Sequence, residues 1–483
     1  MAAPEPVKVR IGFVPTHRWT FTPWCRKMLQ DSLAAIGRIE GVELFAPRDS
    51  GDDKAIDASR GAVPHGSIMN IDHGQALAEY FAGLKLDGLI VCPLDFGDER
   101  AVAAAVQRLG LPVLLYATKE PPAGDDASLQ RLSDSYCGNL AVATAMHRRK
   151  IPFRFAGVFF PDEAGLRREV EDFAAALSIA KGLRNIRVGQ VGHRPPTFES
   201  VAYDEVAMAV KFGQMVIHRG FSDVDHAATA MPDDSPAVRT ILADIRATAP
   251  TITVGEDYLL KAAKFEAALV EFCEHARLSG LAVQCWPQGA GIAMCAVLGR
   301  MTARGIPASC ETDVLGTLSM LISQRSAMNH TVPHLIDWTI QHRGDPNRVL
   351  VWHCGNAPAC LARNAREVAL RHRLDMKGEL PPRPADINSG LYQFQLKPGP
   401  VTFCRLAEYD GSWKMLIAGG RIVPSDETLA GTWGWVELAD HARLYRTLVE
   451  EGFIHHASMI HGDQRRALAL ACRFLGIQPV EVA

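Results

Sequence analysis

Three histidines stand within seven residues near the end of the chain, in the stretch EGFIHHASMIHGD: His455, His456 and His461. Imidazoles are common metal ligands, but they also bind carbonyl groups in purely structural roles. Adjacent residues of an extended segment point to opposite faces, so His455 and His456 would not both bind one ion without a bend. The spacing alone leaves both a metal site and a structural loop open, and any further ligands must come from elsewhere in the chain.

Two carboxylates stand two residues apart in ASCETDVLGTLSM, where an apolar strand is expected to end. Side chains at i and i+2 of a strand share a face, so Glu311 and Asp313 would both point into a cleft at the carboxyl end of the sheet, where open α/β folds bind ligands. The alternative is that Thr312 or Asp313 caps a helix running through VLGTLSMLIS. The sequence supports both interpretations equally.

A further histidine, His353, ends the buried strand expected in VLVWHCGNAP. It precedes a Gly-Asn turn, which suits a site at a sheet edge, although a structural histidine fits as well. One imidazole with one or two carboxylates forms a hard, oxygen-rich site that prefers Mn²⁺ or Mg²⁺ to thiolate-selected zinc. Such a site can polarise a hydroxy-carbonyl compound while a carboxylate moves a proton, which is the chemistry of aldose–ketose interconversion through an enediol.

The elements that position these residues change in character along the chain. At 483 residues, a prior of roughly 150 residues per domain suggests about three domains. Apolar runs alternate with helical stretches over residues 1–140 and again over 141–340, which is typical of parallel, doubly wound α/β domains. Over residues 341–483, shorter strands with Gly, Pro and Asp-Gly signals predict antiparallel hairpins in a β-rich domain closed by a helix.

The composition narrows the class of protein. Lys and Arg number 51 against 54 Asp and Glu, a net charge of −3, which gives no sign of a nucleic-acid or membrane-surface partner. No apolar run approaches the ~18 to 20 residues of a membrane span. The first residues lack the order of a secretory signal, and the 11 scattered cysteines contain no C-x-x-C pair, so we expect a cytoplasmic protein with reduced thiols.

The segments SCETDVLGTLSM, WHCGNAP and EGFIHHAS, in this order, resemble the L-fucose/L-arabinose isomerase superfamily, closest to its L-fucose isomerase-like branch. Weaker matches, DGLIVCPLDFGDE, DSYCGNLAVATAM and VGQVGHRPPTFESVAYDE, extend the resemblance over nearly the whole chain. The resemblance implies two doubly wound (Rossmann-like) α/β domains followed by a β-barrel-like C-terminal domain. It also implies a homo-oligomer, a trimer or hexamer, with sites near subunit boundaries and a divalent metal, typically Mn²⁺ or else Mg²⁺ or Co²⁺.

The resemblance also implies roles for the residues above. Asp313 matches the metal-binding and catalytic aspartate, and His456 the metal-binding histidine, with His455 as the alternative in register. Glu311 matches a neighbouring carboxylate and is a candidate for proton transfer. The residues expected to contact substrate here are His353, Asn356 and His455.

One position departs from the superfamily. Its members also use a glutamate a little over twenty residues before the aspartate, and here LAVQCWPQGAGIAMC offers Gln288 and no carboxylate. A glutamine can bind a metal through its carbonyl oxygen but cannot shuttle a proton at neutral pH. Gln288 is therefore a candidate third ligand. The proton would then pass to Glu311, His353 or a metal-bound water, or the isomerase step has been lost.

Two segments that follow strands carry arginines that suit an anionic substrate. PTHRWTFTPWCRK contains Arg18 and Trp19, and GHRPPTF contains Arg194. The guanidinium fork suits a carboxylate, phosphate or sulfonate better than a neutral hydroxyl, although solvated arginines or subunit salt bridges fit the same pattern. If these residues line the site, the substrate is a sulfonated hexose such as sulfoquinovose, or a sugar phosphate.

The sequence thus predicts a metal-dependent aldose–ketose isomerase that acts on a monosaccharide through a cis-enediol. Two alternatives stay open. One is metal-assisted aldol cleavage or epimerisation of a related sugar. The other is a non-catalytic sugar-binding paralogue, for which Gln288 is the best argument.

Overall fold

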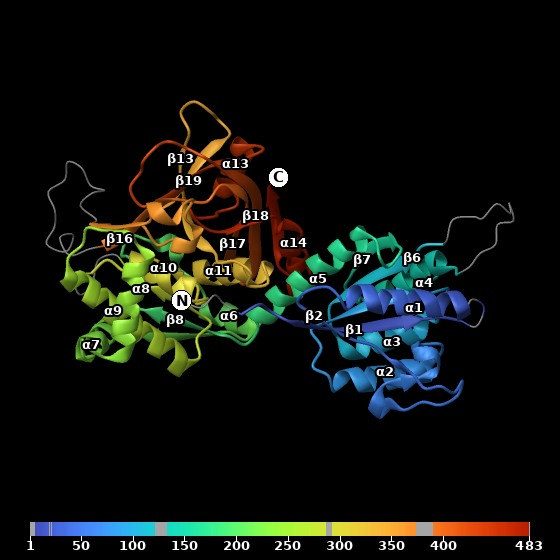
Figure 1. Cartoon of the computed structure of the whole chain (residues 1–483). Coiled ribbons are helices and arrows are strands. Elements are labelled where there is room, and N and C mark those ends of the chain that lie inside the picture. Colours follow the sequence, from blue (N-terminus) through green and yellow to red (C-terminus); the bar gives the residue numbers. More distant parts are fainter. Residues whose placement is uncertain are drawn as a thin grey trace. The chain divides into compact units, whose positions relative to one another are not determined.

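The computed structural model describes residues 5–18, 20, 22–120, 133–285, 292–372 and 390–482. The chain forms two compact units, Val7–Lys181 and a second built on Gly182–Ala483, and each is described by itself (Figure 1). The division into three domains at residues 140 and 340 stays a prediction.

The first unit is built on a parallel five-stranded sheet. Its order is β2-β1-β5-β6-β7, and its strands β1, β5 and β6 are buried almost throughout, as their continuous apolar runs predict. Strand β7, which the sequence grouped with the second series, completes this first sheet. The strands of this sheet are β1 (Val9–Thr16), β2 (Val42–Phe45), β5 (Gly88–Pro93), β6 (Val113–Thr118) and β7 (Phe153–Phe159). Two further short strands, β3 (Arg48–Asp49) and β4 (Ala62–Val63), pair with each other in a separate sheet. The helices are α1 (Thr22–Ile36), α2 (Ile71–Ala82), α3 (Glu99–Leu109), α4 (Ser135–Arg148) and α5 (Ala164–Leu183).

The second unit begins with a parallel four-stranded sheet of order β12-β11-β8-β9. Its strands are β8 (Arg187–Val191), β9 (Met215–Arg219), β11 (Gly280–Val283) and β12 (Ala308–Ser309). The helices are α6 (Glu205–Phe212), α7 (Phe221–Ala230), α8 (Pro236–Thr248), α9 (Glu256–Ala276), α10 (Cys295–Ala303) and α11 (Val314–Ser326). Helix α10 packs closely on the turn that carries Asn356, because a Cβ at Gly299 would lie 2.7 Å from the Ala357 carbonyl oxygen. A glycine is therefore required there.

A large mixed sheet completes the second unit, in the order β10-β15-β16-β19-β14-β13-β20-β17-β18-β21. Strand β18 also pairs with β19, so the hydrogen-bonded pairings from β19 through β14, β13, β20, β17 and β18 return to their start. The strands are β10 (Thr251–Ile252), β13 (His334–Gln341), β14 (Arg348–His353), β15 (Ala369–His372), β16 (Gly390–Gln395), β17 (Gly399–Tyr409), β18 (Ser412–Val423), β19 (Thr432–Glu437), β20 (His456–His461) and β21 (Gln478–Val482). Helices α13 (His441–Glu450) and α14 (Arg465–Leu475) follow β19 and β20.

Local sequence accounts for the longest hairpin of this sheet. Tyr409 pairs with Ser412, so β17 and β18 are joined by the two residues Asp410 and Gly411. Both have positive φ, 50° and 76°, which a two-residue Asp-Gly turn allows. The predicted antiparallel hairpin is therefore confirmed.

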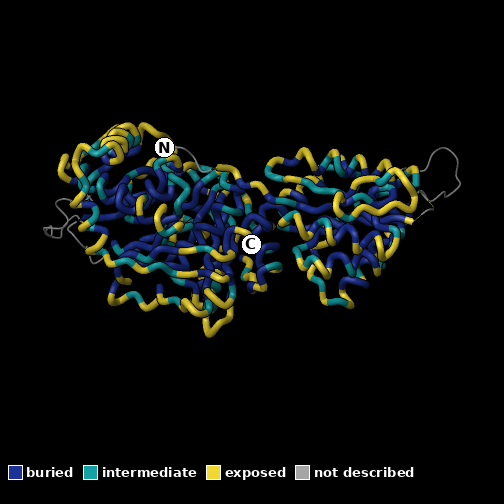
Figure 2. The backbone as a smooth tube through the Cα atoms, turned by 90° about the horizontal axis from the view of Figure 1, so that it is seen from below, coloured by how far each residue is buried: buried dark blue, intermediate teal, exposed yellow. Residues whose placement is uncertain are grey.

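One hydrophobic core joins the parallel and the mixed sheets of the second unit. It includes Val283 of β11, Met320 of α11, Ile336 of β13 and Phe403 of β17. Figure 2 shows buried backbone through the interior of each unit. In the described ranges, no helix combines the length and the apolar character that crossing a bilayer requires.

Candidate metal and active site

Five side chains from four parts of the second unit converge at one place. Asp337, His353 and His456 each offer a ligand atom within 4.8 Å of the other two, and so do Glu311, His455 and His456. Strand pairing explains the first group: Asp337 of β13 lies directly opposite His456 of β20, and β14, which ends at His353, is the other neighbour of β13. The His456 Nε2 lies 2.9 Å from Glu311 Oε2 and 3.5 Å from Asp337 Oδ1.

The atoms that face one another here are buried and have no hydrogen-bond partner among the described residues. They are Glu311 Oε2, Asp337 Oδ1, His353 Nε2 and His456 Nε2. Buried polar atoms without hydrogen bonds are costly, so four in one place indicate that a ligand belongs between them. Two carboxylate oxygens and an imidazole nitrogen suit a hard or intermediate divalent cation, so the residues present fit the expected metal.

His456 is held in place by a buried carboxylate behind it. Its Nδ1–H donates to Asp313 Oδ2 at 2.8 Å, which leaves Nε2 directed at the convergent group. Asp313 is itself fixed by Arg405, whose two terminal nitrogens donate to it at 2.5 and 3.0 Å, and by the Gly316 N–H at 2.8 Å. A carboxylate on the far nitrogen of a ligating histidine sets its tautomer and orientation.

Electrostatics follow from these contacts. Burial opposes ionisation of Asp313, but the Arg405 guanidinium and the His456 imidazole outweigh it and hold the pKa of this carboxyl well below its usual range. Burial likewise opposes protonation of His456, but Asp313 and Glu311 beside it raise the pKa of this imidazole to about 10. Burial would raise the pKa of Glu311, yet His456 brings it below the ordinary value. Both carboxylates are therefore ionised at neutral pH.

His353 differs from His456 in its tautomer. Its Nδ1 accepts a hydrogen bond from the Cys354 N–H at 2.8 Å, so the ring proton of the neutral form lies on Nε2. That N–H is directed toward Asp337, whose Oδ1 is 3.9 Å away. His353 is thus arranged to donate to an oxygen in the site rather than to bind a cation.

The shared strand face predicted for Glu311 and Asp313 is wrong. Strand β12 ends at Ser309, and the chain then turns through Glu311 and Thr312, both in the left-handed region with φ of 60° and 52°. A β-branched residue such as Thr312 occupies this region only where its surroundings enforce it. The turn sends Glu311 to the convergent group and Asp313 to the N-cap of α11, so the helix-cap interpretation is confirmed.

The histidine stretch contains the bend that its sequence left open. His455 precedes β20, and its ring centroid lies 4.2 Å from that of His456 and 5.8 Å from that of Phe198. Burial lowers the pKa of His455 below its ordinary value. His461, at the other end of β20, donates to the Lys397 carbonyl at 2.9 Å and is structural.

Other predicted residues lie in different surroundings. Asn356 accepts a hydrogen bond from the buried His334 at 3.0 Å, so its side-chain oxygen is already used. Arg194 is exposed and donates to the carbonyls of Phe198 and Glu199 at 3.3 and 3.4 Å, within the segment whose Phe198 contacts His455.

The remaining predicted residues belong to the first unit or lie outside the described ranges. Arg18 lies in the first unit, where it donates to the Gly97 carbonyl at 2.9 Å and stacks over Phe96. Trp19 and Gln288 lie outside the described residues.

Sequence reasoning missed Asp337. It lies in the strand HLIDWTIQ, where it is the one carboxylate and belongs to no local motif. The available signal was the family spacing, because Glu311 precedes Asp337 by a little over twenty residues. The family resemblance implies a glutamate and an aspartate separated by such an interval.

Comparison with known proteins identifies the family of the chain. Residues 23–184 match the fucose/sulfoquinovose isomerase N-terminal domain, and residues 351–482 match the L-fucose isomerase C-terminal domain. The chain belongs to the L-fucose isomerase-like family. A sulfoquinovose isomerase from Alkalicoccus urumqiensis is 26% identical over 405 residues, 82% of this chain and 86% of that protein. The sulfoquinovose isomerase of Priestia aryabhattai is 24% identical over 464 residues, 95% of this chain and 97% of that protein. Membership of this family makes the chain a sugar isomerase of the aldose–ketose type, as predicted.

Proposed function

We propose that the protein is a metal-dependent isomerase that converts sulfoquinovose, a sulfonated aldose, into the corresponding ketose through a cis-enediol. The observation that carries the metal site is the set of four buried atoms without hydrogen-bond partners, one each on Glu311, Asp337, His353 and His456. The substrate is proposed from the sulfoquinovose isomerases that resemble nearly the whole chain.

Glu311, Asp337 and His456 would hold the cation, with Mn²⁺ the first choice and Mg²⁺ or Co²⁺ as alternatives. When bound, the cation supplies a Lewis acid for the carbonyl and hydroxyl oxygens of the sugar. Asp313 is then a positioning residue behind His456 rather than the ligand that the resemblance implied, because its oxygens are taken by Arg405, Gly316 N–H and His456.

The two carboxylates divide the proton transfers between them. Glu311, which is ionised, takes the proton from C2 of the aldose and returns it to C1 on the same face of the enediol. Asp337 takes the proton of the O2 hydroxyl as the ketose carbonyl forms and passes it to O1. His353 donates its Nε2–H to a substrate oxygen and so keeps the reacting carbons beside Glu311.

The sulfonate needs a cationic partner outside this group. Arg405 is occupied by Asp313, whereas Arg194 lies on the exposed segment that contacts His455. We assign the sulfonate to Arg194, with His455 contacting the sugar; Arg18 and Trp19 of the first unit stay predicted substrate contacts.

We further propose a cytoplasmic homo-oligomer, a trimer or hexamer, whose two α/β domains are doubly wound and whose mixed sheet forms the barrel-like domain of the family.

Solvent deuterium tests the reaction. The protein is incubated with Mn²⁺ and sulfoquinovose in D₂O, and the product is analysed for mass and for deuterium on C1. We expect a ketose that carries deuterium. Its formation should be lost in Asp337→Asn and retained in Asp426→Asn, which neutralises an exposed carboxylate that is not part of the convergent group. Two carbon fragments would show aldol cleavage instead, and undiminished labelling by Asp337→Asn would refute the assigned ligand set.

Substrate charge is tested separately with glucose, which lacks the sulfonate. The wild type should prefer sulfoquinovose to glucose. Arg194→Gln should raise KM for sulfoquinovose by about tenfold, as expected for the loss of one charge-assisted contact. The turnover of glucose should not change in this variant. An equal effect on both sugars would remove Arg194 from sulfonate recognition.

A further inference from the structure

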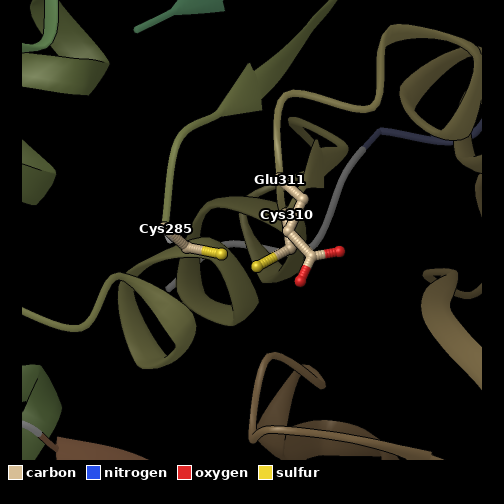
Figure 3. Close-up of side chains that lie close together, drawn as sticks. All are labelled: Cys285, Cys310 and Glu311. Atoms are coloured by element: carbon tan, nitrogen blue, oxygen red, sulfur yellow. The ribbon is translucent and has the colours of Figure 1, made fainter. Parts of the chain in front are cut away.

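A second set of metal-ligating side chains lies next to the convergent group. Cys285 follows β11 and Cys310 follows β12, and these two strands pair in the parallel sheet. Both residues are buried, at 7% and 1% exposure. Figure 3 shows their sulfurs directed toward one another, with the Glu311 carboxylate beside Cys310. One atom from each of the three residues lies within 4.8 Å of the other two.

This donor set differs in chemistry from the one proposed to hold Mn²⁺. Two thiolates and a carboxylate select soft or borderline cations such as Zn²⁺ and Cd²⁺ over Mn²⁺ or Mg²⁺. Three protein ligands also leave a fourth position of a tetrahedral cation open to water. Glu311 is the partly exposed member of the set, with its side chain 17% exposed.

Glu311 is common to both donor sets, because its Oε2 also lies 2.9 Å from the Nε2 of His456, which belongs to the set proposed to hold Mn²⁺. We propose that Cys285, Cys310 and Glu311 form a second cation site, specific for thiophilic divalent ions, and that its occupation draws Glu311 away from His456. Binding releases the two thiol protons to solvent and involves no change of oxidation state. The binding claim is independent of the proposed isomerase reaction, whereas its consequence, inhibition by Zn²⁺, rests on that reaction.

Cd²⁺ alone is the probe for binding, because thiolate-to-cadmium charge transfer absorbs in the ultraviolet. The titration uses metal-free protein in which the two exposed cysteines, Cys137 and Cys360, are replaced by serine. We expect one equivalent of Cd²⁺ to produce the band. Cys285→Ser and Cys310→Ser should each weaken binding by about tenfold or more, and Cys273→Ser, which removes a buried thiol of α9, should not. Absence of the band, or an unchanged band in both site variants, would overturn the proposal.

A measurement that needs no substitution in the site covers the case in which those variants fail to fold. X-ray absorption at the cadmium edge of the same titrated protein should show two sulfur ligands and lighter donors. A first shell without sulfur would overturn the site.

Sharing of Glu311 is tested by activity in saturating Mn²⁺. The Zn²⁺ concentration that halves each variant's own turnover should rise about tenfold or more in Cys285→Ser relative to Cys273→Ser. Two-sulfur Cd²⁺ binding with no such shift would overturn the sharing. Absence of any isomerase turnover in the wild type would refute the proposed function and leave the Cd²⁺ result to decide the binding claim.

Discussion

Replacement of Asp313 by asparagine tests the arrangement behind His456. The carboxylate accepts the His456 Nδ1–H at 2.8 Å. An amide can present its NH₂ there, so Nδ1 becomes the acceptor and Nε2 carries the proton, which removes the lone pair needed by a cation. We expect the affinity for Mn²⁺ to fall about 10- to 100-fold, the usual cost of losing the group that orients a ligating histidine.

The same substitution also unpairs Arg405, which is 3% exposed and has Asp313 as its carboxylate partner. Breaking a buried ion pair from one side costs about 3–5 kcal/mol, so the free energy of unfolding in urea should drop by an amount of that order. The matched control is Asp440→Asn. Asp440 caps α13 through the Arg443 N–H, and asparagine caps a helix as well as aspartate does, so both stability and Mn²⁺ affinity should change little.

Titration of Mn²⁺ by electron paramagnetic resonance measures the affinity, and a double-mutant cycle distinguishes positioning from direct ligation. If Asp313 acts through the imidazole, Asp313→Asn should have no further effect on Mn²⁺ affinity in a His456→Gln background. A full additional loss in that background would show that Asp313 is itself a ligand and would refute the reasoning.

Three further outcomes follow from the site and its surroundings. Glu311→Gln should lower kcat for labelled ketose by about 10²–10⁴, the usual contribution of a general base, and a turnover near that of the wild type would reassign the base. Burial lowers the pKa of His334 to about 3. Below pH ~6.5 the unfolded chain therefore binds a proton that the folded chain does not. The free energy of unfolding should fall by about 1.4 kcal/mol for each pH unit below ~6.5 and stop falling near pH 3. Urea unfolding at pH 7 and 5.5 measures this slope, which His334→Gln should reduce, and an equal slope in that variant would exclude His334 as its source. Gln288→Glu should bring no gain in turnover. A gain of about tenfold or more, which is about 1.4 kcal/mol in the barrier, would show that position 288, and not Glu311, is the place of the family's glutamate.

Local rules predicted those parts of the structure that local contacts determine. The continuous apolar runs gave buried parallel strands, and the Asp410-Gly411 pair gave the hairpin between β17 and β18. Asp313 caps a helix as its position before VLGTLSMLIS indicated. Each of these depends on neighbours within a few residues, so the sequence carries the necessary information.

The composition of the site depends instead on pairing between distant strands. Asp337 meets His456 because β13 pairs with β20, more than a hundred residues later in the chain. No local pattern marks that register. The predicted strand face shared by Glu311 and Asp313 was wrong for a related reason. Residues i and i+2 share a face only in extended backbone, and at Glu311 and Thr312 the backbone turns through the left-handed region.

The proposed assignment also removes the departure that had favoured a non-catalytic paralogue. With Asp313 as the aspartate, the required glutamate falls near Gln288 and is missing. With Asp337 as the aspartate, Glu311 occupies the expected interval, and both carboxylates direct an oxygen at the Nε2 of His456. A paralogue that had lost catalysis would have no reason to direct these carboxylates and imidazoles at one another, because buried polar atoms without hydrogen bonds destabilise the fold unless a ligand compensates them. The uncompensated polar atoms therefore argue for a working site more strongly than the glutamine at 288 argues against one.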